Sequence, residues 1–198
     1  SNQASRTTSA GTPSPPHATS FEPQKEPIVN SQDRFHAVLD GRQPDRLPLI
    51  PISMMAAADV IGVPYKRYAT DYREHVRGQI AYAETFGIDH VSAISDPATE
   101  AADCGAAVIY HDDQPPALDE AHAVLAEKSA LVSLAVPDPR DGARMSNRVR
   151  VVEELASQVG DERIVEGWVE GPIAEASDLR GINRFMIDLF DDERFVRE

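Results

Sequence analysis

The 198-residue chain has 19 Lys and Arg against 33 Asp and Glu, a formal charge of -14, and 41% of its residues are hydrophobic. This balance is typical of a globular domain and excludes a fibrous or largely disordered chain. A field of this sign repels polyanions, so nucleic acid is excluded as a partner. The apolar runs fall far short of the roughly 20 residues that a membrane helix needs, so no membrane partner is expected.

The cysteine content and the N-terminus predict where the protein resides. Cys104 is the single cysteine and cannot form an internal disulfide. The N-terminus lacks the basic stretch, apolar segment and cleavage site of a secretion signal. We therefore expect a cytoplasmic protein.

Residues 1–30 differ in composition from the rest of the chain. They are rich in Ser, Thr, Pro and Ala and show neither helical nor strand periodicity. Such a segment cannot bury enough apolar surface to offset the entropy lost on ordering. The sequence thus predicts a flexible tail over 1–30 and one domain portion over 31–198.

From residue 31 onward, helix signals alternate with strand signals. Capping Ser or Asp residues, apolar residues at helical spacing and terminal glycines predict the helices, and short apolar, partly β-branched runs predict the strands. Helices are predicted over 31–41, 54–62, 71–87, 97–105, 118–131 and 148–160. Strands are predicted over 46–53, 88–95, 106–113 and 162–171.

Strands that alternate with helices predict an α/β fold with a parallel sheet, either a barrel or an open doubly wound sheet. The pattern alone leaves both open. No G-x-G-x-x-G follows the first strand and no G-x-x-x-x-G-K-[ST] occurs. Because these motifs mark the common nucleotide-binding open sheets, their absence favours the (β/α)8 barrel.

In either fold, ligands meet the carboxyl ends of the strands, and we call this surface the mouth. Ser53 stands at the first strand exit and is followed by Met54 and Met55, which either line a pocket or pack in the core. Asp96 follows the second strand. It either caps the next helix or presents a carboxylate to a ligand.

The segment 167–181, GWVEGPIAEASDLRG, combines a strand exit with several acids. Glu170 ends the predicted strand, and Gly171-Pro172 suits a tight turn into a helix. Glu175 and Asp178 then either complement the helix dipole or contact a ligand. We expect Glu170 and Gly171 to border the mouth.

These segments together resemble the N-terminal half of the uroporphyrinogen decarboxylase superfamily, which also contains corrinoid-dependent methyltransferases. The resemblance is carried by RFHAVLDGRQPDRLPLIP, GIDHVSAISDPATEAADCGAAV and VEGWVEGPIAEASDLRGINRFMIDLFDDERFV. It implies a (β/α)8 TIM barrel of which this chain holds only the first part. Such a portion leaves strand edges and apolar surface uncovered, so a second copy of the chain is a candidate partner.

The resemblance transfers site residues unevenly. It places Asp96 where the decarboxylases have an Asp that contacts the pyrrole N–H groups of the substrate, so Asp96 is the candidate catalytic residue. The decarboxylases have an Arg-Gln-Ala-Gly-Arg run that binds substrate carboxylates, where this chain has Met55 and Asp59 in place of the arginines. A Tyr of the decarboxylases falls at or beside Asp178. We expect Ser53, Met54, Met55, Glu170, Gly171 and Asp178 to bind substrate.

These departures favour the methyltransferase-like branch, because a polycarboxylate needs cations that are missing here. That branch implies a corrinoid (cobalamin) methyl donor, carried by a corrinoid protein or as free methylcobamide, and a small-molecule thiol or similar acceptor. It also implies a zinc ion whose His and Cys ligands are expected outside this chain, so no metal ligand is assigned within it. Two alternatives stay open: tetrapyrrole decarboxylation in porphyrin synthesis, and a truncated binding module without turnover.

Overall fold

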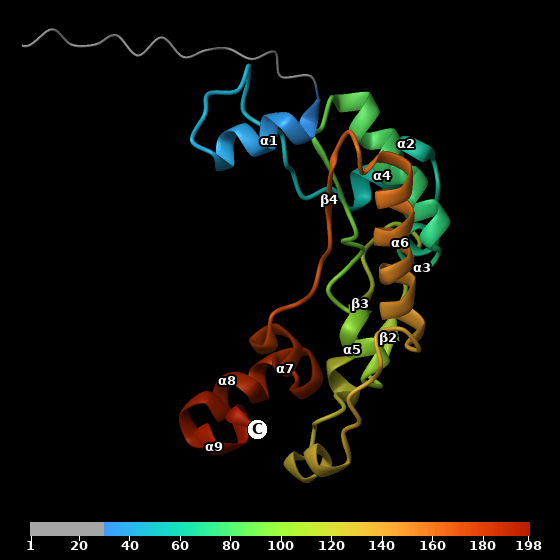
Figure 1. Ribbon diagram of the computed structural model, residues 1–198. Coiled ribbons are helices and arrows are strands. Elements are labelled where there is room, and N and C mark those ends of the chain that lie inside the picture. The colour runs from blue at the N-terminus through green and yellow to red at the C-terminus, as the bar shows by residue number, and fades with distance from the viewer. Residues whose placement is uncertain (1–29) are drawn as a thin grey trace, which may run out of the picture.

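The computed structural model describes residues 30–198 (Figure 1). Apart from Asn30, the predicted tail lies outside the described residues. Within them, no helix is both long and apolar enough to cross a membrane.

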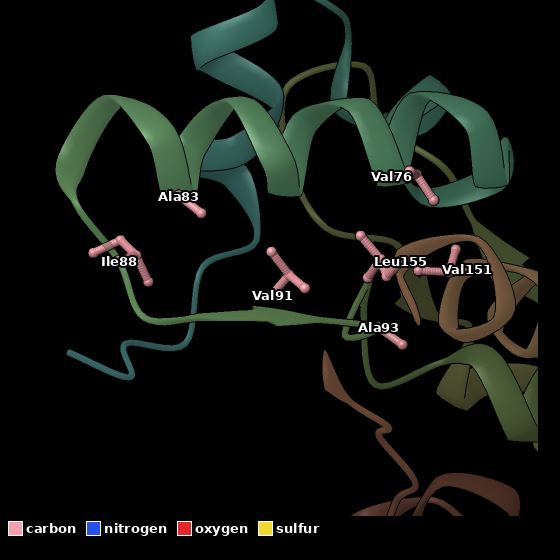
Figure 2. Close-up of a cluster of buried hydrophobic side chains, with 7 residues drawn as sticks. All are labelled: Val76, Ala83, Ile88, Val91, Ala93, Val151 and Leu155. Carbon is pink, nitrogen blue, oxygen red and sulfur yellow. The ribbon is translucent and has the colours of Figure 1, made fainter. Parts of the chain in front are cut away.

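A pair of parallel strands lies at the centre of the fold. β1 (His90–Ser92) pairs with β4 (Ile164–Glu166), with His90 opposite Ile164. α4 (Tyr72–Phe86) and α6 (Ala143–Val159) pack against the pair and against each other. The buried cluster between them is drawn in Figure 2 and consists of Val76, Ala83, Ile88, Val91, Ala93, Val151 and Leu155. This arrangement confirms a parallel strand pair covered by helices.

The two faces of the strand pair differ in polarity. Val91 and Val165 face the helices and join the apolar cluster. Because side chains alternate along a strand, His90, Ser92 and Glu166 fall on the opposite face. That polar face is the one a barrel would enclose.

Short helices precede α4 and pack on it. α2 (Met55–Ile61) and α3 (Tyr65–Thr70) enclose the fully buried Tyr68. Gly78 of α4 allows the close approach, because a Cβ there would lie 2.9 Å from the Tyr68 ring. α1 (Ser31–Leu39) is held to the start of β1 through Asp89. Its Gln32 also donates to the carbonyls of Gly160 and Arg163, just before β4.

Between β1 and α6 the chain forms an irregular arm. It contains α5 (Thr99–Asp103), the antiparallel strands β2 (Val108–Ile109) and β3 (Ala117–Leu118), and the 3₁₀ turns η1 (Glu120–His122) and η2 (Lys128–Ser133). The long helix predicted over 118–131 is therefore wrong. The strand predicted over 106–113 is shorter than expected, since only β2 forms there. It pairs with β3 in a hairpin rather than with the parallel pair.

The C-terminal helices follow β4 and lie away from the α4–α6 layer (Figure 1). They are α7 (Pro172–Arg180), α8 (Ile182–Asp191) and α9 (Glu193–Arg197). Leu179 of α7 packs against Ala101 and Leu125. The buried Arg180 donates to Asp188 at 2.7 Å and so ties α7 to α8.

The remaining differences from the predicted elements have local causes. Residues 46–53 form no regular strand, because Pro48 and Pro51 lack the N–H groups of a ladder. One strand-like hydrogen bond still links this segment to the residue before β1, because the Asp89 N–H donates to the Leu49 carbonyl at 3.0 Å. α6 begins at Ala143, before the predicted start, and α3 is an addition to the predicted elements. No closed barrel forms within residues 30–198.

Candidate functional site

Arg148 of α6 joins the exits of the two parallel strands. Its Nη2 donates to the Asp96 carbonyl at 3.0 Å and its Nη1 to the Trp168 carbonyl at 3.2 Å. The same Nη1 forms an ion pair with Glu100 of α5 at 2.6 Å. The structure therefore brings Asp96 together with the segment that carries Glu170.

Asp96 is fully buried, and both of its carboxylate oxygens are engaged. One oxygen accepts the Ala98 N–H at 3.1 Å in the turn that leads into α5. The other is paired with Arg144. The bond to Ala98 closes a turn before α5, whose N-cap is Ala98 and has no side-chain cap, so the helix cap predicted at Asp96 is wrong. The carboxylate also does not lie open at the mouth. Its predicted contact with substrate remains a prediction, because a ligand would have to displace Arg144.

Arg144 lies in a polar layer beneath the exit of β1. Its guanidinium donates to Thr99 Oγ1 and to the Tyr110 hydroxyl, both at 3.2 Å. The Tyr65 hydroxyl donates to the carbonyl of Ser95. Burial raises the pKa of Tyr65, so it remains a protonated donor.

Carboxylates gather where α5, the β4 exit and α7 meet. Glu100 Oε1 accepts the Glu170 N–H at 3.2 Å, and the Trp168 indole N–H donates to Glu170 Oε1 at 2.9 Å. Burial, followed by repulsion from Glu100 and Asp178, raises the pKa of Glu175 to about 7. Burial and the charge of Glu170 raise the pKa of Asp178 to about 6. We name Glu100, Glu170, Glu175 and Asp178 the carboxyl cluster; at neutral pH it holds protons as well as charge.

The residues predicted at the first strand exit differ in their exposure. Ser53 is buried, its carbonyl accepts a hydrogen bond from Gln79 at 2.7 Å, and its Oγ has no partner among the described residues. Met54 packs with the core cluster of α2 and α3. Met55 is 39% exposed and borders a pocket of about 150 Å³.

That pocket is acidic. Met55 and Asp59, one turn apart on α2, line it together with Tyr65, Asp112 and Asp113. Met55 and Asp59 occupy the positions where the resemblance places a pair of arginines in the decarboxylases. No cationic side chain lines the pocket in the described part of the chain.

A second hollow lies beside the carboxyl cluster and is mostly apolar. It has a volume of about 290 Å³ and is lined by Val149, Val152, Trp168 and Val169, with Glu100, Arg148 and Glu170 among its polar walls. Gly171 is exposed and starts α7, with Pro172 at its first turn, as predicted. The backbone of Gly171 is extended and a Cβ there would meet no neighbouring atom, so the geometry does not require glycine at this position.

The two basic residues of the site, Arg144 and Arg148, were not predicted from the sequence. Arg144 lies between two predicted helices, and Arg148 is only the first residue of the second. Their spacing of one helical turn was the available signal, because it places both guanidinium groups on one face. Glu100 is likewise predicted only as part of a short helix. Within residues 30–198 no group of three or more His, Cys, Asp or Glu side chains is placed to hold a metal ion.

Comparison with known proteins places this geometry in a family. The family model of uroporphyrinogen decarboxylase (URO-D) matches residues 30–198. The chain belongs to the uroporphyrinogen decarboxylase family. The match covers every described residue, so the parallel pair, the carboxyl cluster and α7–α9 are all parts of the URO-D domain.

A solved structure with the same fold is a methyltransferase from Methanosarcina mazei. It is 19% identical in sequence, the TM-score is 0.69, and the match covers 84% of this chain and 50% of that one. This likeness shows the fold, and the URO-D chain described here spans about half the length of that relative. A search of curated protein sequences finds no match.

Proposed function

We propose that this URO-D family chain is part of an enzyme that transfers a methyl group between a corrinoid and a thiol or similar acceptor. The observation that carries the proposal is the acidic pocket of Met55, Asp59, Asp112 and Asp113. A tetrapyrrole with many carboxylates needs cationic partners, and Arg or Lys supplies them in bidentate or point contacts. Here the corresponding walls are acidic or apolar, which disfavours such a substrate within the family.

The surroundings of the strand exits favour the same conclusion. Arg144 and Arg148 are the cations that bind the residues of the exits. Arg144 is already paired with Asp96, and Arg148 is already paired with Glu100. Each guanidinium therefore already has a carboxylate partner within the chain, which disfavours its use for a substrate carboxylate. The fold relative named as a methyltransferase agrees with this proposal but does not establish it.

The residues of this chain would act by positioning and by hydrogen bonding. Trp168 and Val169 offer an apolar surface to a large flat ligand, and Glu170 offers an acceptor at its edge. A protonated Glu175 can donate a hydrogen bond near neutral pH, because its pKa is raised to about 7. The methyl donor is proposed to be a corrinoid protein or free methylcobamide, and the compartment the cytoplasm.

Zinc is a separate part of the proposal. When bound, zinc lowers the pKa of a thiol and so supplies a thiolate nucleophile. The described residues do not fit such a site, because no suitable His, Cys, Asp and Glu group occurs among them. No step at these residues is routed through zinc, and its ligands are proposed to lie outside this chain.

Ligand binding can be tested through Trp168, the single tryptophan of the chain. Methylcobalamin and, under anaerobic conditions, uroporphyrinogen are each titrated into the protein while Trp168 emission is recorded. Free N-acetyl-tryptophanamide corrects for light absorbed by the ligands. We expect saturable quenching by methylcobalamin and none by uroporphyrinogen. Transfer of the methyl group is followed by the loss of the methyl–cobalt absorbance after a thiol is added.

The other outcomes separate the alternatives. Saturable binding of uroporphyrinogen with formation of coproporphyrinogen would replace the proposal by tetrapyrrole decarboxylation. Saturable binding of methylcobalamin without transfer to any thiol, even when the part of the barrel that carries the proposed zinc ligands is present, would indicate a binding module. Absence of binding by both ligands would refute the proposed substrate class for this chain.

A further inference from the structure

Arg148 has more partners at the strand exits than an ordinary ion pair requires. Its side chain is 8% exposed, and its Nη groups reach Asp96, Glu100 and Trp168, which lie on three different segments. We propose that Arg148 is a positioning residue that acts through Glu100 to fix Glu170 at the mouth. The importance of Arg148 for catalysis rests on the proposed function, whereas the experiment that tests its positioning role does not.

The segment that carries Glu170 lacks the usual support of a strand. β4 ends at Glu166, and in the described part of the chain no backbone–backbone hydrogen bond holds residues 167–170. Side chains take over that task. Arg148 binds the Trp168 carbonyl at 3.2 Å, and Glu100 Oε1 accepts the Glu170 N–H at 3.2 Å. The position of Glu170 therefore depends on the Arg148–Glu100 pair.

Both members of the pair are needed in their present form. Glu100 Oε1 receives Arg148 Nη1 at 2.6 Å and the Glu170 N–H at the same time. A planar guanidinium can serve several fixed acceptors, whereas a lysine ammonium acts as a point charge. Glu100 Oε2 and Arg148 Nε are buried without partners among the described residues. Unpaired buried atoms cost free energy, and Arg144 Nε shares this feature, so it does not distinguish the two arginines.

Arg144 provides a matched control. It lies one turn earlier on the same helix, and its side chain is 9% exposed against 8% for that of Arg148. It pairs with Asp96 and contacts neither Glu100 nor Glu170. A change that merely loosens the buried face of α6 should affect the two variants alike.

The experiment compares Arg148→Lys with Arg144→Lys, with Trp168 as the reporter because its indole N–H binds Glu170. Urea unfolding first verifies that each variant is folded. We expect Arg148→Lys to shift Trp168 emission to longer wavelength and to raise acrylamide quenching severalfold, while Arg144→Lys leaves both unchanged. Wild-type emission and quenching in folded Arg148→Lys, or equal changes in both variants, would overturn the proposal.

Glu100 variants keep the proposal testable if Arg148→Lys fails to fold. Glu100→Gln retains an oxygen that accepts both donors, so Trp168 emission should stay as in the wild type. The midpoint of a pH titration of that emission should fall, because the charge of Glu100 raises the pKa of Glu175 and Asp178. Glu100→Leu removes the acceptor and should shift the emission as Arg148→Lys does. Unchanged Trp168 emission in folded Glu100→Leu would contradict the proposal that Arg148 acts through Glu100 on Glu170, whatever the methyl-transfer assay shows.

Discussion

At the scale of single residues, the buried carboxyl group of Asp89 and the half-buried one of Glu175 behave in opposite ways. Burial by itself would raise the pKa of Asp89, but hydrogen bonds from Arg46, Leu49, Ser31 and Arg34 lower it to about 2. Burial acts on the pKa of Glu175 in the same direction, but too few hydrogen-bond donors reach its carboxylate, so its pKa rises to about 7. The number of donors that reach each carboxylate decides the sign.

Asp89→Asn should strongly destabilise the fold. Asp89 is 1% exposed and binds Arg34 and Arg46 at 2.5 Å each, so the change leaves Arg46 without its anion and Arg34 with only the exposed Asp45. Breaking a buried pair costs about 3 kcal/mol or more. Urea unfolding at pH 7 measures the loss. Asp45→Asn, which removes an exposed partner of Arg34, is the control and should cost far less.

The pH dependence of this contribution has a definite sign. The folded pKa of Asp89 lies below that of an ordinary carboxyl, so its stabilisation is complete above about pH 4 and is lost as the pH falls toward 2. The stability difference between Asp89→Asn and the wild type should therefore shrink in acid. An equal difference at pH 3 and pH 7 would contradict the ion-pair explanation.

Glu175→Gln should stabilise the protein at high pH only. The folded pKa of about 7 lies above that of the unfolded chain, so the stability contributed by the protonated form is complete in acid. It is lost as the pH rises toward 7, while the unfolded chain already ionises. We expect Glu175→Gln to unfold at higher urea than the wild type at pH 8 and at the same urea concentration at pH 4. Glu153→Gln, an exposed change on α6, should show no such pH dependence.

At the scale of elements, the start of α6 is set by a residue distant in sequence. Gly142, its N-cap, has no side chain to offer. The carboxylate of Asp103, at the end of α5, accepts the N–H groups of Arg144 and Met145 at 3.0 and 2.7 Å. This cap explains why α6 begins several residues before the predicted start and why Arg144 becomes helical.

Asp103→Ala should therefore destabilise α6 at its first turn. Loss of an N-cap carboxylate costs about 1 to 2 kcal/mol, and the first turn, which carries Arg144, should fray. Amide hydrogen exchange at Arg144 and Met145, together with urea unfolding, measures both effects. Asp141→Ala removes the same charge just before α6, where its side chain binds no helix N–H in the described part of the chain. It should change stability by less than about 0.5 kcal/mol.

At the scale of the whole molecule, the parallel pair has no further strand on either side among the described residues. Apolar side chains near the C-terminal helices are open to solvent, with Val169 81%, Ile173 71% and Phe190 87% exposed. Exposed apolar patches and free strand edges favour association. A closed barrel would cover both.

The isolated chain should therefore self-associate as its concentration rises. The double change Val169→Glu and Phe190→Glu should shift the protein toward monomer, because it adds charge to the uncovered surface. Sedimentation velocity over a range of concentrations measures the effect. The control is the double change Ser157→Glu and Gln158→Glu on the exposed face of α6, which adds the same charge without removing apolar surface. A monomeric wild-type chain at all concentrations, or an equal shift in the control, would contradict the prediction.

Local signals were enough to predict several elements. Asp71 and Gly87 bound α4, and Gly171-Pro172 starts α7, as predicted. The helix predicted over 118–131 does not form, because its helical pattern competes with contacts of Leu125 to Ala101 and Leu179 that only the folded chain supplies. Asp96 does lie at a strand exit, but its ion pair with Arg144 could not be predicted.

The sequence by itself determined the acidic charge, the alternation of helices and strands, and the helix ends that have their own caps. These features depend on composition and on residues a few positions apart. Only the tertiary structure decided that Arg148 joins Asp96 to Glu100 and Trp168, and that Glu175 retains a proton near neutral pH. The physical reason is distance along the chain: Arg148 meets Glu100 and Asp96 across 48 and 52 positions, and burial exists only once those segments have packed.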